Sequence, residues 1–272
     1  MSWWSLLHHW EFPPTIVGAC TVLLLAYFGL RRCKIDLKAL SFFSGILLIF
    51  LALCSPLDVL ADDYLFSAHM VQHMMLGTFA PPLLVAGLPA SFVQFLLRFK
   101  PLAFLEKLLS TPALALCLGC GTFWIWHLPY LYNLALKNES VHLVEHILFM
   151  ISGTILWWPV LKPIPEGKLA PMPALGYLAL ASFLGMVMGI MFFISDTVFY
   201  SFYNDIEDEL GILSLIRNDW GLTALDDQKL GGGIMWEPMG LIFLGVMMGG
   251  MVNWYKRSEP EHEGRIENVG EK

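Results

Sequence analysis

The chain has 272 residues, of which 57% are hydrophobic and only 14% are charged, and its mean hydropathy is +0.63. Soluble domains of ordinary composition carry more charge, so that class is excluded and a polytopic protein surrounded by membrane lipid is predicted. The formal net charge of −7 at pH 7 disfavours a nucleic-acid partner.

Seven apolar runs follow along the chain, each long enough to cross about 30 Å of hydrocarbon as a helix. Their continuous apolar character excludes the alternating strands of an outer-membrane barrel. We predict an all-α fold, a seven-transmembrane-helix bundle forming a single domain at 1–256, followed by a charged cytoplasmic tail at 257–272. The runs lie near residues 13–30, 39–55, 64–88, 110–128, 141–161, 172–195 and 232–254.

The first run is expected to remain in the protein. The preceding segment, MSWWSLLHHWEF, has no basic region and no small-residue cleavage site, so no cleavable signal peptide is predicted. This segment, which contains His8 and His9, is typical of an amphipathic stretch at a membrane interface.

The third run contains the segment SAHMVQHMML. His69 and His73 are four residues apart, which places both imidazoles on one face of a helix, about one turn from each other. Met70 and Met74 flank this pair. Polar groups at such depth in a membrane are rare and usually face the bundle interior or a wet cavity, so the pair is a candidate for metal binding.

The fourth and fifth runs bring three more histidines to a similar depth. His127 closes the fourth run, and His142 and His146 open the fifth in VHLVEHILFM, again four apart. Five imidazoles at the ends of three consecutive helices can converge on one cavity. Imidazole beside thioether suits copper, especially Cu(I), better than zinc or magnesium. A hydrogen bond between helices is the alternative role for His127, and ordinary packing is the alternative for the methionines.

Small residues and prolines have structural interpretations. Pro81, Pro82 and Pro89 are expected to kink or end the third helix. Glycines spaced three or four residues apart in the last two runs would let those helices approach closely, and they would also permit a homodimer.

Basic residues predict the orientation of the helices. With seven spans, 13 of the 16 Lys and Arg residues fall on one side, and only Lys137, Arg217 and Lys229 fall on the other. By the positive-inside rule the N-terminus is outside and the C-terminus is cytoplasmic. Seven of the eight histidines and most acidic residues then lie at the outer face, so any chemistry is expected to face outward.

Three segments of the chain together resemble a known family. They read SPLDVLADDYLFSAHMVQHMMLGTFAPPLLVAGLP, WHLPYLYNLALKNESVHLVEHILFMISGTILWWPVL and DDQKLGGGIMWEPMG. They are similar to segments of the seven-helix CtaG family of bacterial cytochrome c oxidase assembly factors, from about Leu53 to Trp254. The positions that carry the resemblance are Asp58, His69, His73, Pro81, Pro82, Trp126, His127, His142, Glu145, His146, Trp157, Trp158, Pro159, Asp227, Gln228, Gly231, Gly232, Met235 and Trp236.

The resemblance implies a multi-pass protein of the bacterial inner (plasma) membrane that assists the assembly of a haem-copper cytochrome c oxidase. It implies no enzymatic activity. Copper destined for the oxidase would be the cargo. The expected partners are subunits of the oxidase and a periplasmic copper chaperone that acts as donor.

Residue chemistry and resemblance together predict a copper site at the outer face of the bundle. Asp58, Asp62 and Asp63 are expected to attract cations at its rim, and Glu145 to accept the second N–H of an imidazole. The predicted metal ligands are His69, His73, His127, His142, His146, Met70, Met74, Asp58 and Met235. The residues predicted to surround them are Glu145, Asp62, Asp63, Asp227 and Gln228.

Two alternatives from other classes remain open at this point. His142-Leu-Val-Glu145-His146 has the H-x-x-E-H order of inverted zinc metallopeptidases, in which the glutamate is the general base, so a zinc-dependent membrane hydrolase is one alternative. A haem- or quinone-binding redox protein is the other. Histidines four apart on one helix cannot bind opposite faces of a single haem, which disfavours the haem interpretation.

Overall fold

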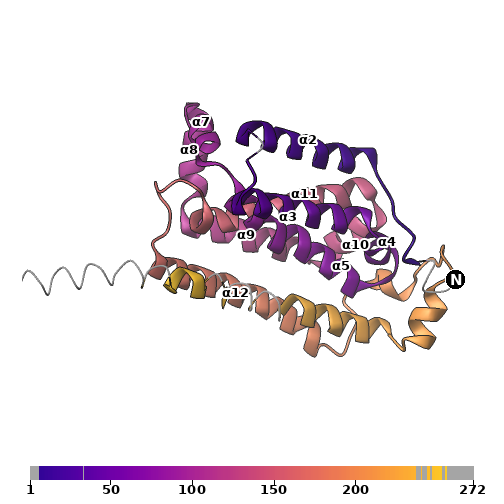
Figure 1. The fold of residues 1–272 in the computed structure, drawn as a ribbon. Helices are drawn as coiled ribbons and strands as arrows, with labels where there is room; N and C mark the ends of the chain where they lie inside the picture. The colour runs from indigo at the N-terminus through magenta and orange to yellow at the C-terminus, as the bar shows by residue number, and fades with distance from the viewer. Residues whose placement is uncertain are drawn as a thin grey trace, which may run out of the picture.

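The computed structural model describes residues 6–32, 34–236, 240, 244, 245, 247–252 and 255. This described part is helical and contains no strand, which confirms the predicted all-α class (Figure 1). Three of its short segments are π-helical (η1, η2 and η4), and one is a 3-10 helix (η3). The elements are α2 (Pro14–Arg31), α3 (Leu37–Cys54), α4 (Pro56–Val59), η1 (Leu60–Tyr64), α5 (Phe66–His73), η2 (Met74–Phe79), α6 (Ala80–Gly87), α7 (Ala90–Leu96), α8 (Lys100–Leu109), α9 (Pro112–Trp126), α10 (Pro129–Lys137), α11 (Glu139–Leu161), α12 (Pro171–Ile194), η3 (Ser201–Asn204), η4 (Leu215–Asp219) and a helix at 224–236.

Four of the described helices are long and apolar enough to cross a membrane: α2, α3, α11 and α12. The number rises to six if two bent pairs each count as one span, the segment Phe66–Gly87 with α7 and α8 with α9. These helices occupy the positions of the first six predicted runs. The predicted seventh span at 232–254 begins inside the helix at 224–236 and lies partly outside the described residues, as the predicted tail lies wholly outside them. The structure thus supports four to six candidate spans, and the orientation stays a prediction.

The third predicted run ends beside Pro89, as expected, whereas Pro81 and Pro82 lie within the continuous segment Phe66–Gly87. Helix α5 continues through η2 into α6, which ends at Gly87. Pro89 then caps the N-terminus of α7, and the two parts are bent by 92° relative to each other. Proline has a fixed φ and no N–H, so a helix commonly ends or bends beside it.

The contact between η2 and α11 determines how closely the two helices with histidine pairs approach. Pro81 and Pro82 have no N–H, so neither can donate to the carbonyl of Gly77 as a regular helix would require. Gly153 of α11 packs against this carbonyl, and a Cβ at position 153 would lie only 2.1 Å from the Gly77 oxygen. No larger residue fits without movement of a helix. The two backbones therefore meet directly, one turn beyond His73.

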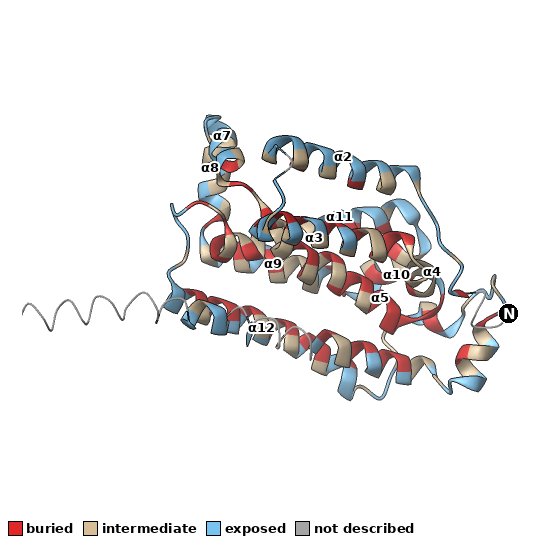
Figure 2. Cartoon of the chain, in the orientation of Figure 1, coloured by how far each residue is buried: buried red, intermediate tan, exposed pale blue. Residues whose placement is uncertain are grey.

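Burial is uneven across the bundle (Figure 2). In α2 only 11% of the apolar window is buried inside the protein, against 39% to 44% in α3, α11 and α12. An apolar helix this exposed suits a position against lipid. Helix α5 is the opposite case, because seven of its eight residues are buried. The histidine pair of α5 consequently lies in the protein interior.

Candidate metal centre

The start of α5 is held by a carboxylate from a distant part of the chain. Its N-cap residue, Leu65, has no side-chain acceptor. The fully buried Asp227 accepts hydrogen bonds from the backbone N–H of Phe66 at 2.7 Å and of Ser67 at 3.1 Å instead. These are N–H groups that a helix leaves unpaired at its N-terminus. Asp227, predicted to lie around the site, thus acts indirectly, by positioning the helix that carries His69.

The structure brings the two predicted histidine pairs together. The ring centroids of His69 and His73 on α5 are 4.0 Å apart, and those of His142 and His146 on α11 are 4.1 Å apart. Between the two helices, the rings of His69 and His142 lie 5.2 Å apart, and those of His73 and His146 lie 5.7 Å apart. All four side chains are buried. Four imidazoles from α5 and α11 therefore share one interior position.

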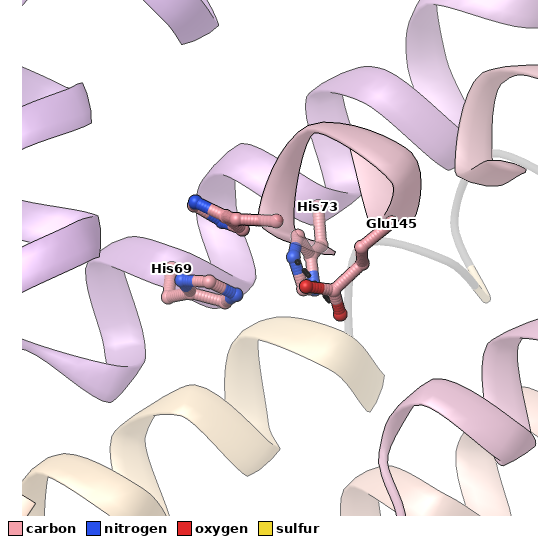
Figure 3. Close-up of side chains that lie close together, drawn as sticks. His69, His73 and Glu145 are labelled. Atoms are coloured by element: carbon pink, nitrogen blue, oxygen red, sulfur yellow. Dashed lines mark ion pairs between the residues drawn. The ribbon is translucent and has the colours of Figure 1, made fainter. Parts of the chain in front are cut away.

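Glu145 of α11 completes the group (Figure 3). One ligand atom from each of His69, His73, His142 and Glu145 lies within 4.8 Å of the other three. The nearest approach to the carboxylate is that of His73, whose Nε2 is 3.7 Å from Glu145 Oε1. A metal with bonds of about 2 Å holds its ligand atoms roughly 3 to 4 Å apart. Small side-chain movements would close this group around one ion.

The donor atoms of this group are buried and unpaired. Among the described residues no hydrogen-bond partner reaches Nε2 of His69, His73, His142 or His146, and none reaches either carboxylate oxygen of Glu145. Leaving a buried polar group unpaired costs free energy, and native proteins rarely tolerate it. A cation bound by several such atoms together would satisfy them all. The donor set therefore fits a metal ion.

Two of the imidazoles have a neighbour at Nδ1, which leaves Nε2 available as the donor atom for a metal. His69 Nδ1 lies 3.2 Å from the carbonyl oxygen of Ala61, so this nitrogen carries the proton and Nε2 keeps its lone pair. His142 Nδ1 lies 3.5 Å from Oδ2 of Asp62. Metal-binding histidines commonly direct their other nitrogen toward a carbonyl or a carboxylate in this way. The orienting carboxylate is that of Asp62, whereas Glu145, for which this role was predicted, lies among the donor atoms.

His127 and Met70 form a second arrangement beside the first. His127 Nδ1 lies 2.8 Å from the carbonyl oxygen of Phe123, and Nε2 lies 3.5 Å from the sulfur of Met70. Both neighbours are acceptors, but a neutral imidazole has only one N–H. One of the two contacts therefore lacks a proton, and a soft cation between Nε2 and the sulfur would satisfy it. The His127 ring is 5.8 Å from that of His73, so this pair adjoins the main group.

The other two predicted sulfur ligands lie in apolar surroundings. The sulfur of Met74 accepts a hydrogen bond from Thr78 Oγ1 at 3.7 Å, and its side chain packs in a cluster with Trp157. Met235 packs in the cluster that also contains Met70 and Phe66. The structure thus places Met70 beside a histidine nitrogen and places Met74 and Met235 in hydrophobic packing.

The predicted rim carboxylates lie between α3 and α5. Burial raises the pKa of Asp58 to about 7 and that of Asp63 to about 6, and the negative charge of the neighbouring Asp62 is the second cause in both cases. These carboxyl groups thus bind protons more readily than usual, which is the expected behaviour of crowded acids without a neutralising cation. Asp58 also accepts a hydrogen bond of 2.6 Å from Gln72 Nε2, which ties the rim to α5.

Gln72 and two stacked tyrosines beside the histidines were not predicted from the sequence. Gln72 was visible as the polar residue inside the His69–His73 pair, and its buried amide also donates to the carbonyl of Ala52 at 3.0 Å. The Tyr132 ring lies 5.1 Å from that of His69 and stacks on Tyr200 at 3.8 Å. No local pattern marked these rings as neighbours of the site. They shield one side of the histidines from water.

Gln228, also predicted near the site, has a structural role. Its Oε1 accepts from the backbone N–H of Phe199 at 2.7 Å, and its Nε2 donates to the carbonyl of Thr197 at 3.0 Å. The side chain therefore attaches the segment after α12 to the helix at 224–236. Tyr200 in that segment donates to the carbonyl of His127 at 2.9 Å, which links the attachment back to the histidines.

Fold and site together define a class: a helical protein with several candidate membrane spans and a buried group of imidazoles and one carboxylate suited to a metal ion. The family described as cytochrome c oxidase caa3 assembly factor (Caa3_CtaG) matches residues 21–257. The chain therefore belongs to this family, which confirms the resemblance carried by the three quoted segments.

Curated relatives add similarity without a described activity. Uncharacterized proteins of Mycobacterium bovis and Mycobacterium tuberculosis are each 24% identical over 278 residues, covering 91% of this chain and 40% of the relative. An uncharacterized protein of Mycobacterium leprae is 24% identical over 220 residues, covering 71% of this chain and 30% of the relative. The chain thus spans at most about two fifths of the length of these relatives. No solved structure matches it.

Proposed function

We propose that this protein is a membrane assembly factor that binds copper at its outer face and supplies it to cytochrome c oxidase. The observation that carries the proposal is the set of buried donor atoms without hydrogen-bond partners on α5 and α11. The proposed ligands come from His69, His73, His142 and Glu145, with His146 adjoining them. Membership of the assembly-factor family supports the oxidase as recipient.

Copper is preferred to zinc because of the soft donors beside the main group. The sulfur of Met70 faces His127 Nε2 at 3.5 Å, and thioether is a ligand typical of Cu(I). Neither imidazole nor thioether needs to lose a proton near neutral pH to bind the ion. Zinc remains the second candidate for the same imidazoles, because imidazole and carboxylate also bind it.

The hydrolase alternative fits the geometry less well. In that chemistry the glutamate between the two histidines must stay free of the metal to act as general base for water. Here Glu145 lies among the donor atoms, and its carboxylate approaches a histidine of another helix, His73, at 3.7 Å. The haem alternative is disfavoured for a steric reason, since four donor atoms within 4.8 Å of one another leave no room for a macrocycle between them. We therefore propose a role without catalysis.

Burial of the side chains decreases from the histidines toward Asp62, and this gradient supports a path for the ion. The side chain of Asp62 is 36% exposed, and that of His142 beside it is 10% exposed. His69, His73 and Glu145 are completely buried. We propose that copper from a periplasmic chaperone meets Asp62 first, passes to His142 and then reaches the buried donors. This route assumes the predicted orientation, in which the N-terminal ends of α5 and α11 lie at the outer face of a bacterial inner membrane.

Copper content of the detergent-purified protein tests the proposal. The wild type should retain about one ion per chain, and the variant His69→Ala/His73→Ala should retain little, because it removes two of the donors. The matched control is His8→Ala/His9→Ala, which removes two histidines from an exposed part of the chain and should leave copper content unchanged. Equal copper in the wild type and the first variant would contradict the site. Elemental zinc and the visible spectrum, measured on the same samples, distinguish the hydrolase and haem alternatives.

A further inference from the structure

The helices α7 and α8 lie across one end of the bundle. The break before α7 bends the chain by 92°, and the break after α8 bends it by 78°. Figure 1 shows this pair at the end of the molecule opposite to α4 and α10. With seven and ten residues, these helices are about 10 and 15 Å long, too short to cross a membrane. A pair of this kind is suited to the interface between lipid and water.

A cavity of about 310 Å³ lies between this pair and α11. This volume is at the lower end of the roughly 300 to 1,000 Å³ of typical ligand pockets. Its lining is almost entirely apolar and includes Phe92, Leu96, Leu105, Leu109 and Ile155.

The one charged residue of the lining is already neutralised. Glu106 Oε1 is 2.8 Å from Lys162 Nζ, and it also accepts hydrogen bonds from Trp158 Nε1 at 3.1 Å and from Ser110 Oγ at 2.7 Å. This carboxylate therefore needs no further partner from a ligand. The cavity offers hydrocarbon contact and no unpaired polar group of its own.

Basic residues and exposed aromatic rings lie on the same chain segment as the cavity lining, outside the cavity itself. Arg98, Lys100 and Lys107 are exposed, and among the described residues none of them forms an ion pair. Phe99 and Phe104 are 53% and 71% exposed. Exposed aromatic rings with basic residues are typical of a surface that enters the headgroup region of a membrane.

We propose that the α7–α8 pair binds one anionic phospholipid, with an acyl chain in the apolar cavity and the phosphate at Arg98, Lys100 and Lys107. An amphiphile with a negative headgroup uses both features at once. A neutral apolar ligand would use the cavity without the three basic side chains, and a second protein chain would have to bury them. The inference is independent of the copper site, because it rests on residues at the other end of the bundle.

Photocrosslinking in nanodiscs tests this site directly. The protein is placed in nanodiscs with phosphatidylglycerol or phosphatidylcholine that carries a photoreactive acyl chain, and the labelled peptides are identified by mass spectrometry. Labelling is expected to concentrate at 88–109 and 154–158. Phosphatidylglycerol should label at least about fivefold more than phosphatidylcholine, which corresponds to the attraction of a single basic residue near an anionic surface.

Two variants separate the headgroup from the acyl chain. Arg98→Gln/Lys100→Gln/Lys107→Gln should abolish the preference for phosphatidylglycerol, whereas Leu109→Trp should fill the cavity and reduce labelling by both lipids. The matched control, Arg32→Gln/Lys34→Gln/Lys38→Gln, removes the same charge from another turn and should retain the preference. Circular dichroism of each variant verifies that it is folded.

Three outcomes would overturn the proposal. Labelling spread evenly over α2 and α3 would show only general contact with lipid. Equal labelling by the two lipids would exclude a preference for an anionic headgroup. A dimer in native mass spectrometry that protects 88–109 from both lipids would assign the cavity to a second copy of the chain.

Discussion

Two glutamates lie within this bundle in opposite surroundings. Glu106, on α8, accepts hydrogen bonds from Lys162, Trp158 and Ser110. Glu145, on α11 among the histidines, is completely buried, and neither of its oxygens has a hydrogen-bond partner among the described residues. The first carboxylate obtains its cation from the chain itself. The second has no such cation among the described residues, and leaving a buried carboxylate unpaired costs free energy, so we propose that a bound metal ion supplies it.

Glu106 thus carries a structural charge, whereas we assign a function to the carboxylate of Glu145. The ammonium group of Lys162 neutralises Glu106 permanently, as we propose copper neutralises Glu145 when it is bound. The protein should therefore depend on Lys162 for stability and on Glu145 for binding. The following variants test this difference, in order of decreasing effect on the free energy of unfolding.

Replacing Lys162 by Met should destabilise the protein most. Removing one member of a buried ion pair costs roughly 3 to 5 kcal/mol, and the 17% exposure of the Glu106 side chain places the expected loss near the lower value. Thermal unfolding of the purified protein measures the effect. The double variant Lys162→Met/Glu106→Gln should recover most of the loss, because no unpaired charge remains. An unchanged melting temperature in the single variant would show that this pair is not structural.

Replacing Gly153 by Ala should destabilise the protein and also weaken copper binding. The new Cβ would lie 2.1 Å from the carbonyl oxygen of Gly77, so α11 must move away from η2. Such overpacking typically costs about 1 to 3 kcal/mol. Melting temperature and copper content should fall together. The control is Gly121→Ala in α9, where a Cβ has no neighbour within 4 Å and alanine favours the helix. Normal copper content in Gly153→Ala would show that this contact does not set the spacing of the ligands.

Replacing Asp227 by Ala should have a smaller effect on stability. It removes the acceptor for the N–H groups of Phe66 and Ser67, and loss of a helix cap costs about 1 kcal/mol. Because α5 carries two of the proposed ligands, copper affinity should also decrease. The matched control is Asp226→Ala, because the exposed Asp226 bonds to Thr223 within its own helical turn. If both variants bind copper like the wild type, the cap does not position the site.

Replacing Glu145 by Gln should have the smallest effect on stability and a large effect on binding. The metal-free protein should unfold within about 1 kcal/mol of the wild type or be slightly more stable, because the substitution removes an unpaired buried charge. Copper affinity should fall at least about tenfold, by analogy with the loss of a partner at a metal site. Titration of the metal-free protein with Cu(I) measures it. A strong loss of stability without copper would place Glu145 in the same category as Glu106.

Much of this architecture follows from local patterns. The described candidate spans coincide with apolar runs, because the length of such a run is set by the thickness of the hydrocarbon layer. The break near Pro89 follows from the missing N–H of proline. The pairing of His69 with His73, and of His142 with His146, follows from 3.6 residues per turn. Each of these features involves residues close together in the chain.

Which side chains from other helices face the histidines did not follow from local patterns. Spacing placed Glu145 near the histidines but could not separate a ligand from an orienting group, and it did not connect Asp62 with His142. That distinction depends on how α11 is rotated and how closely it approaches α5. The Gly77–Gly153 contact and the Asp227 cap set these quantities, and the cap joins residues 161 positions apart in the chain. Contacts over such separations exist only after the helices have packed, so periodicity identifies the candidate donors and packing selects which atoms face one another.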